Sequence, residues 1–316
     1  MSHLIESMMY VGEKPWHGLG VPLTNPPTIA EALIASGLNW NAAKEPVFTQ
    51  DGTKVPDTYA VVRDTDKAIL GTVGERYHIV QNSEAFKVFQ PMLDAGAITL
   101  ETAGATKGGS RVWVLAKCKT EPIEIVPGDK VELYILFYHS HDGSLRINYG
   151  FTPIRTVCNN TLTLALNDSR SKLFKIKHTK GAIDAVNAVT EIMNVARGEF
   201  EATAEQYKAL ARKGCDLKQL ENYVRIVFDL KAIDPSKPVD EQESKLVEKI
   251  KPLFEKGRGN DLPGVKNTMW AAYNAVTEYL THERGKSAEN RFDTLNFGQG
   301  KELNDKALQE ALVLAA

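Results

Sequence analysis

The sequence predicts an α+β protein in which an antiparallel β-sheet, with a hairpin and a packed helix, precedes a mostly helical C-terminal region. Between Ile98 and Phe151, apolar runs of strand length are separated by glycine, proline and aspartate. Asp142-Gly143 lies between two of these runs and favours a type I′ hairpin turn, because both central residues of that turn need positive φ. From Ala182 onwards, apolar residues recur at helical spacing.

The composition is that of a globular protein without a strong bulk charge. The 316 residues are 43% hydrophobic and 25% charged, and the net charge is −2. Any nucleic-acid site must therefore be a local patch. The three cysteines are scattered, and neither a signal segment nor a membrane span is recognised, so we expect a cytoplasmic protein with no membrane partner.

Residues 1–96 are predicted to form an N-terminal α+β region. Thr28 is expected to begin a short helix that reaches Leu38. Strands are expected around Val47 and over residues 59–63 and 69–73, followed by a helix over residues 82–93.

Residues 97–181 are predicted to form the hairpin and helix core, with further strands over residues 98–102, 111–117 and 173–178. A two-residue turn at Asp142-Gly143 would place Tyr138 opposite Ile147, Leu136 opposite Tyr149, and His139 opposite Arg146. One face of the hairpin is then predicted to be core, and it carries Tyr134, Leu136, Tyr138, Leu145, Ile147, Tyr149 and Phe151. The other face includes Ile135, Phe137, His139, His141, Arg146 and Asn148, and is where a ligand is expected.

A helix is predicted to follow the hairpin, with Thr152 as its cap and Pro153 in its first turn. Its outer side would carry an uncharged polar stripe beside Arg155, made of Thr156, Asn159, Asn160, Thr163 and Asn167. Such a stripe suits a partner that needs hydrogen bonds, such as a nucleic-acid backbone or a neighbouring subunit. The alternative is a polar stripe buried within the domain.

Residues 182–316 are predicted to form a helical C-terminal region. The first expected helix runs from Ala182 to Arg197, and the alternative is that it continues past Gly198 to Lys213. Further helices are expected over residues 217–230, 241–254 and 264–283, with a last helix near the C-terminus. Trp270, Tyr273, Val276 and Leu280 share one side of the fourth helix and are expected in a core or a subunit contact.

Two motifs invite a chemical interpretation. His139, His141 and Asp142 have the spacing of a partial metal site, although Asp is also favoured in turns, and two histidines at a partly exposed strand end are the simpler reading. Residues 104–111 resemble a phosphate-binding P-loop, but a strand rather than a helix is predicted after Ser110. What remains is a glycine-rich hairpin tip that brings Lys107 and Arg111 near a phosphate backbone, or an ordinary flexible hairpin.

The clearest charge signal lies between Arg170 and Lys180. This segment contains five basic residues and no acidic residue: Arg170, Lys172, Lys175, Lys177 and Lys180. As a strand it would present Lys175 and Lys177 on one face, which suits contacts to a nucleic-acid backbone, while the alternative is a solvated face. No catalytic arrangement of serine, histidine and carboxylate can be placed, which favours a non-catalytic protein over an enzyme.

Several motifs resemble the phage/plasmid-like protein family, which is built on a domain of unknown function. They are Pro15-Trp16-His17-Gly18-Leu19-Gly20, Tyr77 with Val80-Gln81-Asn82, His141-Asp142-Gly143-Ser144, the stretch from Thr152 to Leu162, the stretch from Trp270 to Tyr279, and Asn296-Phe297-Gly298. This resemblance implies a mobile element in a bacterial host, and therefore the host cytoplasm.

The order of elements over residues 98–180 also resembles the phage single-strand annealing recombinases of the Erf, RecT and Red-beta group. That resemblance implies a curved antiparallel sheet with a packed helix and a basic groove, in rings or helical filaments that need neither metal nor nucleotide. The DNA-binding residues expected on this basis are Lys107, Arg111, Arg146, Arg155, Asn159, Asn160, Lys172, Lys175 and Lys177.

The leading hypothesis is a homo-oligomeric protein that binds and anneals single-stranded DNA without a cofactor, and whose C-terminal helices recruit a replication or recombination protein. The first alternative is a metal-dependent nuclease or hydrolase that uses His139, His141 and Asp142. The second alternative is a counter-defence protein that binds a host protein or a small nucleotide.

Overall fold

The computed structural model describes residues 5–12, 20–145, 148–156, 160–161, 182–231, 244–285, 291, 294–295 and 298–316. It confirms the α+β class, with mixed and antiparallel sheets in the N-terminal half and a mostly helical C-terminal region. The chain forms two compact units. Unit 1 comprises Met1–Lys119, Tyr134–Phe151 and Ser171–Met193, and unit 2 comprises Thr120–Leu133, Thr152–Arg170 and Asn194–Ala316.

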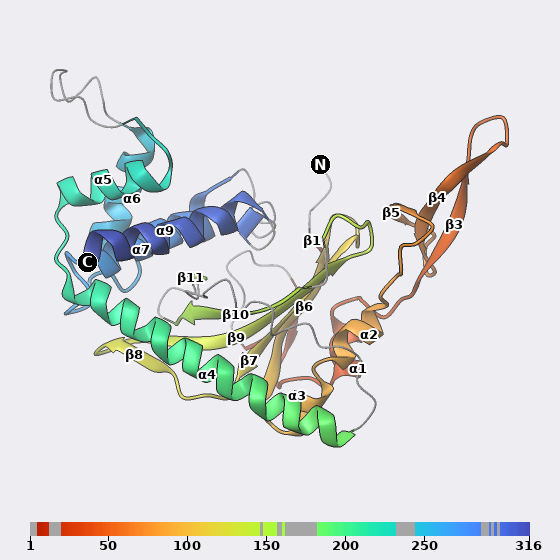
Figure 1. Cartoon of the computed structure of the whole chain (residues 1–316), viewed down its shortest axis with the longest axis horizontal. Helices are drawn as coiled ribbons and strands as arrows, with labels where there is room; N and C mark the ends of the chain where they lie inside the picture. Colours follow the sequence, from red (N-terminus) through yellow and green to blue (C-terminus); the bar gives the residue numbers. More distant parts are fainter. Residues whose placement is uncertain are drawn as a thin grey trace. The chain divides into compact units, whose positions relative to one another are not determined.

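The boundaries of these units differ from the predicted domain boundaries at residues 96 and 181. The reason is the main sheet, in which strands from before residue 96 pair with strands that follow it. The order of the neighbouring strands is β11-β10-β9-β7-β6-β1-β2, and β8 also pairs with β9 (Figure 1). The strands are β1 (Ile5–Val11), β2 (Val21–Leu23), β6 (Ile98–Thr106), β7 (Arg111–Cys118), β8 (Ile123–Val126), β9 (Asp129–Ser140), β10 (Asn148–Arg155) and β11 (Asn160–Thr161).

Strand β9 buries the face that was predicted to bind a ligand. Between Val131 and His139, its buried side chains alternate along the strand and are Val131, Leu133, Ile135, Phe137 and His139. The face that was predicted to be core is only partly buried at Tyr134, Leu136 and Tyr138, so the prediction is wrong for these residues, whereas Phe151 is buried as predicted. Both faces of β9 are apolar, and pairing with β7 determines which of them is buried. The small buried residues Val114 and Ala116 of β7 pair with Phe137 and Ile135.

The connection between β9 and β10 is also wider than predicted. Strand β9 ends at Ser140 and β10 begins at Asn148, and of the predicted turn residues Gly143 has positive φ while Asp142 does not. The turn is therefore not the predicted type I′ turn. Arg146 and Ile147 lie outside the described residues, as do the side chains of Asn148 and Tyr149, so the predicted pairs that involve them stay predictions.

The helix predicted from Thr152 is absent from the described part of this segment, because β10 continues through Pro153 to Arg155. Ile154 and Arg155 pair with Thr161 and Asn160 of β11. Phe151, Pro153 and Arg155 are buried while the residues between them are partly exposed, which is the two-residue period of a strand. Residues 157–159 and 162–181 lie outside the described residues, and with them most of the predicted polar stripe.

A second sheet in unit 1 has the order β3-β4-β5 and confirms three predicted strands: β3 (Ala42–Phe48), β4 (Lys54–Arg63) and β5 (Ile69–Gly74). Strand β5 pairs only with residues from Thr58 to Val62 of β4. Beyond this pairing, β3 and β4 form a two-stranded ribbon that extends away from α1 and α2 (Figure 1). We call residues 47–57 the arm.

Three short helices complete unit 1: α1 (Ile29–Ala35), α2 (Asn82–Lys87) and α3 (Gln90–Asp94). Thr28 caps α1 as predicted, in a capping box with Glu31. The single helix predicted over residues 82–93 is in fact two helices. Pro91 lies in the first turn of α3, where its missing N–H donor is tolerated, and it could not have continued α2.

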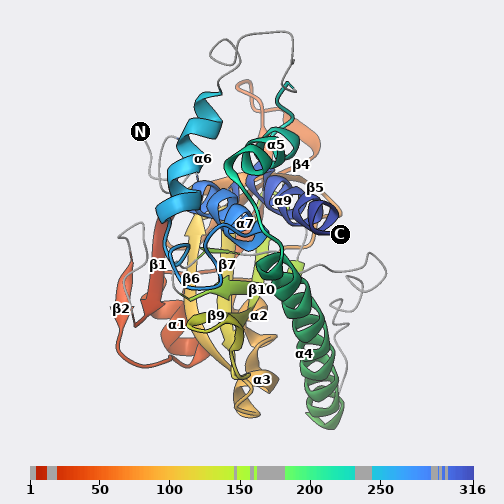
Figure 2. The same ribbon diagram turned by 90° about the vertical axis from the view of Figure 1, so that its left-hand side faces the viewer.

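The helices of the C-terminal region are α4 (Ala182–Arg212), α5 (Leu217–Val227), α6 (Lys245–Lys256), α7 (Met269–Glu278), the π-helix η3 (Tyr279–Glu283) and α9 (Gln299–Ala315). Helices α5, α6, α7 and α9 gather in unit 2 (Figure 2). Helix α7 is buried on every side, and the predicted core positions Trp270, Tyr273, Val276 and Leu280 are confirmed. Within the described residues, no helix is both long enough and apolar enough to cross a membrane.

Candidate nucleic-acid interface

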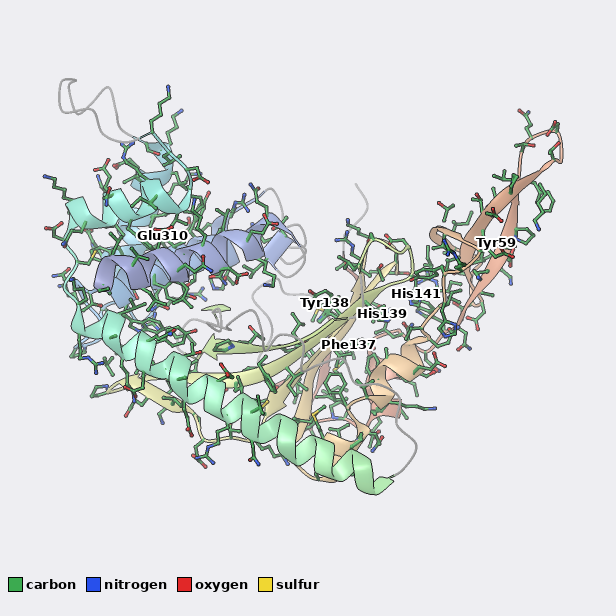
Figure 3. The ribbon with its side chains drawn as sticks, in the orientation of Figure 1. Tyr59, Phe137, Tyr138, His139, His141 and Glu310 are labelled. Carbon is green, nitrogen blue, oxygen red and sulfur yellow. The ribbon has the colours of Figure 1, made fainter. Side chains whose placement is uncertain are left out.

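One face of the main sheet in unit 1 carries aromatic, aliphatic and basic side chains that remain partly exposed. Register pairs Lys117 with Tyr134, Leu115 with Leu136, and Arg111 with Ser140, so these residues of β7 and β9 lie on the same side. Tyr138 is labelled in Figure 3 near the end of β9. We call this surface the open face, and it consists of Arg111, Leu115, Lys117, Tyr134, Leu136 and Tyr138.

A buried tryptophan, Trp113, lies on the same side of the sheet as the open face. Trp113 pairs with Tyr138 on one side and with Gly104 of β6 on the other. A Cβ atom at Gly104 would lie 2.4 Å from the Trp113 ring and 2.5 Å from the carbonyl oxygen of Ser7, so only glycine fits there. The Trp113 indole nitrogen donates a hydrogen bond to the Thr102 hydroxyl at 3.4 Å. This part of the sheet is therefore closely packed and preformed.

Two predicted DNA-binding residues lie at one end of the open face. Lys107 is exposed in the turn between β6 and β7 and has φ of 53°, with Gly108 and Gly109 also at positive φ. Arg111 is partly exposed, and its guanidinium donates to the Ser144 hydroxyl at 3.4 Å. Strand β7 begins directly after this turn, which confirms that the glycine-rich segment is a hairpin tip and not a P-loop.

Most of the other predicted DNA-binding residues lie outside the described residues: Arg146, Asn159, Lys172, Lys175 and Lys177. The backbone of Asn160 is described, in β11, but its side chain is not. The basic strip and the amide pair therefore stay predictions.

Arg155 is not a candidate for phosphate contact, because unit 2 buries it completely. Its guanidinium makes a two-point ion pair with Asp129, at 2.7 and 2.8 Å, and also donates to the carbonyl oxygen of Gly259 at 2.9 Å and to Asn260 Oδ1 at 3.1 Å. The Trp270 indole nitrogen donates to the same Asp129 carboxylate at 2.7 Å. The prediction is wrong because charge alone does not distinguish a surface arginine from one held inside by a carboxylate.

The two histidines of the metal hypothesis are buried, not partly exposed as predicted. Their ring centroids are 4.8 Å apart, and His141 Nε2 lies 3.0 Å from Asn82 Oδ1. Burial lowers the pKa of His139 to about 3 and that of His141 to about 4, so both are neutral near pH 7. The Asp142 carboxylate accepts the Ser144 backbone N–H at 2.8 Å, as expected in a turn. Among the described residues, no three histidine, cysteine, aspartate or glutamate side chains are arranged to hold a metal ion.

Sequence reasoning missed Tyr134, Tyr138 and Lys117 as candidate site residues. A signal was present in β7, where Val112, Val114 and Ala116 alternate with large or charged residues. The small apolar set is typical of a buried face. Pairing β9 with this strand would have placed its tyrosines on the other face.

Residues 69–307 match the family described as "Domain of unknown function (DUF932)", and the chain belongs to this family. The matched segment contains every residue of the open face. The chain matches no curated protein and no solved structure.

Proposed function

We propose that the protein binds single-stranded DNA across the open face and, as a homo-oligomer, anneals complementary strands during recombination or replication of a phage or plasmid. The observation that carries the proposal is the alternation of Tyr134, Leu136 and Tyr138 on β9. Alternate residues of a strand are about 6.6 Å apart on one face, so Tyr134 and Tyr138, with Leu136 between them, are roughly 13 Å apart and offer separate surfaces on which bases can stack.

The basic residues of the open face suit the sugar–phosphate backbone. Lys117 pairs with Tyr134 at one end, and Arg111 lies at the other end next to the exposed Lys107. Cations at both ends of an aromatic strip would neutralise phosphates while the bases stack between them. A protein with a net charge of −2 requires such a local arrangement.

Stacking also suits annealing. A base held by its flat face leaves its pairing edge accessible to a second strand. Repetition of one small patch around a ring or along a filament would multiply the local positive charge, which a monomer of this composition lacks. The setting in a bacterial cytoplasm follows from the family resemblance and is part of the proposal. Recruitment of a replication or recombination protein by the C-terminal helices is a further part of it.

The direct test is the affinity of a fluorescently labelled oligonucleotide, measured by anisotropy. Tyr134→Ala and Tyr138→Ala are each expected to weaken binding by about fivefold to a hundredfold, the usual effect of removing one stacking side chain. Tyr59→Ala is the matched control, because Tyr59 is a partly exposed tyrosine on β4, outside the open face. Unchanged affinity in both open-face variants would remove this surface from the proposal.

Annealing itself is tested with complementary labelled strands and with particle images taken with and without single-stranded DNA. Rings or filaments and a faster annealing rate would support the proposal, while uniform monomers in both conditions would contradict it. A protein that binds no oligonucleotide but retains a discrete host partner in a pull-down would instead support the counter-defence alternative.

A further inference from the structure

The arm presents an apolar side chain near its end with little to cover it. Phe48 is 55% exposed, and most of the arm residues around it are exposed as well. A two-stranded ribbon has only marginal stability in water on its own, so a partner surface would stabilise it.

A basic side chain lies beside this phenylalanine. Phe48 and Lys54 are directly opposite each other across β3 and β4, so their side chains share one face of the ribbon. Exposed prolines stand in both strands, at Pro46 and Pro56. Since proline cannot donate a backbone hydrogen bond, strand addition along the arm is disfavoured. The arm therefore offers side chains, an aromatic ring next to an ammonium group, more readily than a backbone edge.

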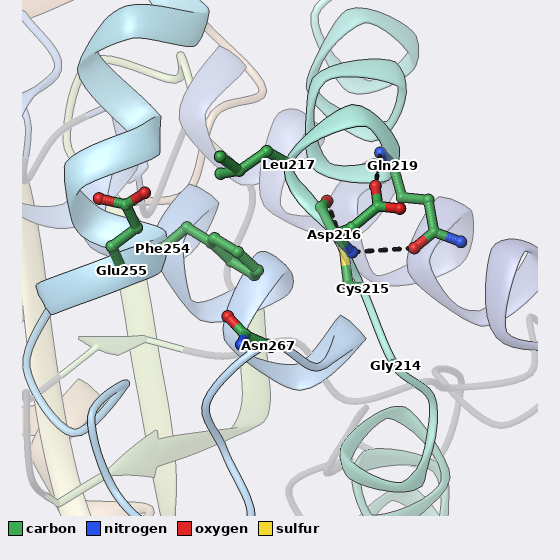
Figure 4. A pocket seen from close by; sticks show the side chains of 8 residues that line it. All are labelled: Gly214, Cys215, Asp216, Leu217, Gln219, Phe254, Glu255 and Asn267. Carbon is green, nitrogen blue, oxygen red and sulfur yellow. Dashed lines mark hydrogen bonds between the residues drawn. The ribbon is translucent and has the colours of Figure 1, made fainter.

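Unit 2 contains a pocket of about 610 Å³ with complementary chemistry, shown in Figure 4. It lies between the start of α5, the end of α6 and the segment that precedes α7. Leu217, which is 45% exposed, and Phe254 provide apolar surface, while Asp216 and Glu255 provide two carboxylates. The remaining described lining residues are Gly214, Cys215, Gln219 and Asn267, so none of the described residues that line the pocket is basic.

Hydrogen bonds hold the walls of this pocket in place. The Cys215 backbone N–H donates to the carbonyl oxygen of Asn267 at 2.8 Å. Asp216 caps α5 by accepting the Gln219 backbone N–H at 2.8 Å, and Gln219 Oε1 accepts the Asp216 backbone N–H at 2.9 Å. The pocket is therefore formed before any partner arrives, which lowers the entropy cost of binding.

We propose that the arm of one copy of this chain inserts Phe48 into the pocket of a second copy, with Lys54 facing the carboxylates of Asp216 and Glu255. Two kinds of complementarity support this occupant. The exposed ring of the arm matches the apolar surface of the pocket, and the ammonium group of the arm matches the two carboxylates that line it. Because arm and pocket are different surfaces, the contact is head-to-tail and builds rings or filaments. It concerns assembly alone and does not require that the open face binds DNA.

The first experiment compares the mass distribution of full-length variants by light scattering after size-exclusion chromatography. Phe48→Asp or Leu217→Asp is expected to raise the concentration for half-assembly by about thirtyfold or more, the effect of losing a central interface side chain. Val313→Asp is the matched control, since Val313 is 70% exposed on α9 and lies in neither surface. Circular dichroism melting of each variant shows whether the fold is retained.

Mixing the two variants gives the sharper result. The Phe48→Asp chain keeps its pocket and the Leu217→Asp chain keeps its arm, so the mixture can form one contact and is expected to yield dimers that neither variant forms alone. A charge exchange adds a second readout: Lys54→Glu and Glu255→Lys should each weaken assembly, and mixing or combining them should restore it.

The proposal is overturned if the wild-type protein is monomeric at all concentrations, if both variants assemble like the wild type, or if their mixture stays monomeric. Oligonucleotide affinity measured on the same variants separates the two proposals. Loss of assembly with retained binding of single strands supports the arm contact, and binding lost only in Tyr134→Ala and Tyr138→Ala concerns the open face.

Discussion

Single residues in this protein take their roles from burial more than from their chemical type. Arg155 and Arg111 are both basic residues of the main sheet, yet one is buried against Asp129 and the other remains partly exposed. The sequence could not predict the burial of Arg155, because the carboxylate that holds it lies on another strand. Asp129, Asn260 and Trp270 converge on it only after the fold has formed.

Arg155→Leu is expected to lower the free energy of unfolding by about 3–5 kcal/mol, because it leaves the Asp129 carboxylate buried without its partner. Urea denaturation followed by circular dichroism measures the change. Arg197→Ala is the control: Arg197 pairs with Glu201 on the surface of α4, and such pairs contribute about 0.5 kcal/mol or less. Equal effects of the two substitutions would contradict the role given to the buried pair.

The histidine pair predicts how stability depends on pH. Burial lowers the pKa of His139 to about 3, and repulsion from a protonated His141 acts in the same direction. In the unfolded chain a histidine titrates near its ordinary pKa of about 6.5, so below that pH the unfolded state binds more protons. The stability linked to this histidine is therefore complete above pH 6.5 or so and is lost as the pH falls toward the folded-state pKa.

When the pH is lowered from about 7 to about 5, the free energy of unfolding of the wild type should fall by about 2 kcal/mol more than that of the His139→Leu variant, which lacks the titrating group. The measurement is the free energy of unfolding of both proteins at the two pH values. If the free energy of unfolding falls equally in the wild type and the variant, His139 is protonated in the folded state as readily as in the unfolded chain, and burial does not lower its pKa.

At the scale of elements, the sequence predicted what short-range patterns determine. The capping box at Thr28 set the start of α1, and the apolar spacing of Trp270 and Tyr273 identified the buried helix α7. The prediction of a helix after Phe151 was wrong. Thr-Pro is a helix-start signal by local rules, but pairing with β11 and the ion pair to Asp129 keep this segment extended. Long-range contacts overrode a local preference.

The same lesson applies to the open face. Both faces of β9 are apolar, so its own residues did not show which face would be buried. The predicted core face was chosen for its tyrosines, whose rings are apolar but whose hydroxyl groups tolerate water. Register with β7 decides the question, and register between distant strands is not visible in one strand.

Gly104 gives a prediction about the packing of β6. Gly104→Ala is expected to lower the free energy of unfolding by about 1–3 kcal/mol, because the added methyl group would overlap the Trp113 ring and the carbonyl oxygen of Ser7. Gly150→Ala in β10 is the control, as a Cβ atom there meets nothing within 4 Å. Thermal melting of both variants measures the difference, and equal melting temperatures would show that β6 can shift to accept the methyl group.

At the scale of the whole molecule, the net charge of −2 limits how DNA binding can respond to salt. Three cations, Lys107, Arg111 and Lys117, lie on or next to the open face. If all three contact phosphates, the logarithm of the binding constant should fall with the logarithm of salt concentration with a slope of about −2. Lys117→Gln should reduce the size of this slope by about 0.7, whereas Lys249→Gln on α6 should leave it unchanged. Titrations at several salt concentrations measure both, and a much steeper slope would point to further cations in the site.

The two units are interleaved along the chain, since β9 and β10 each contribute to both. Neither unit can therefore be released by a single cut in the gene. A fragment that begins at Ala182 would retain Trp270 of α7 and Asn260 of the preceding loop but lack Asp129 and Arg155, to which those two side chains are hydrogen-bonded. Genetic recombination that replaced one of these parts of the chain without the other would therefore leave the core of unit 2 incomplete.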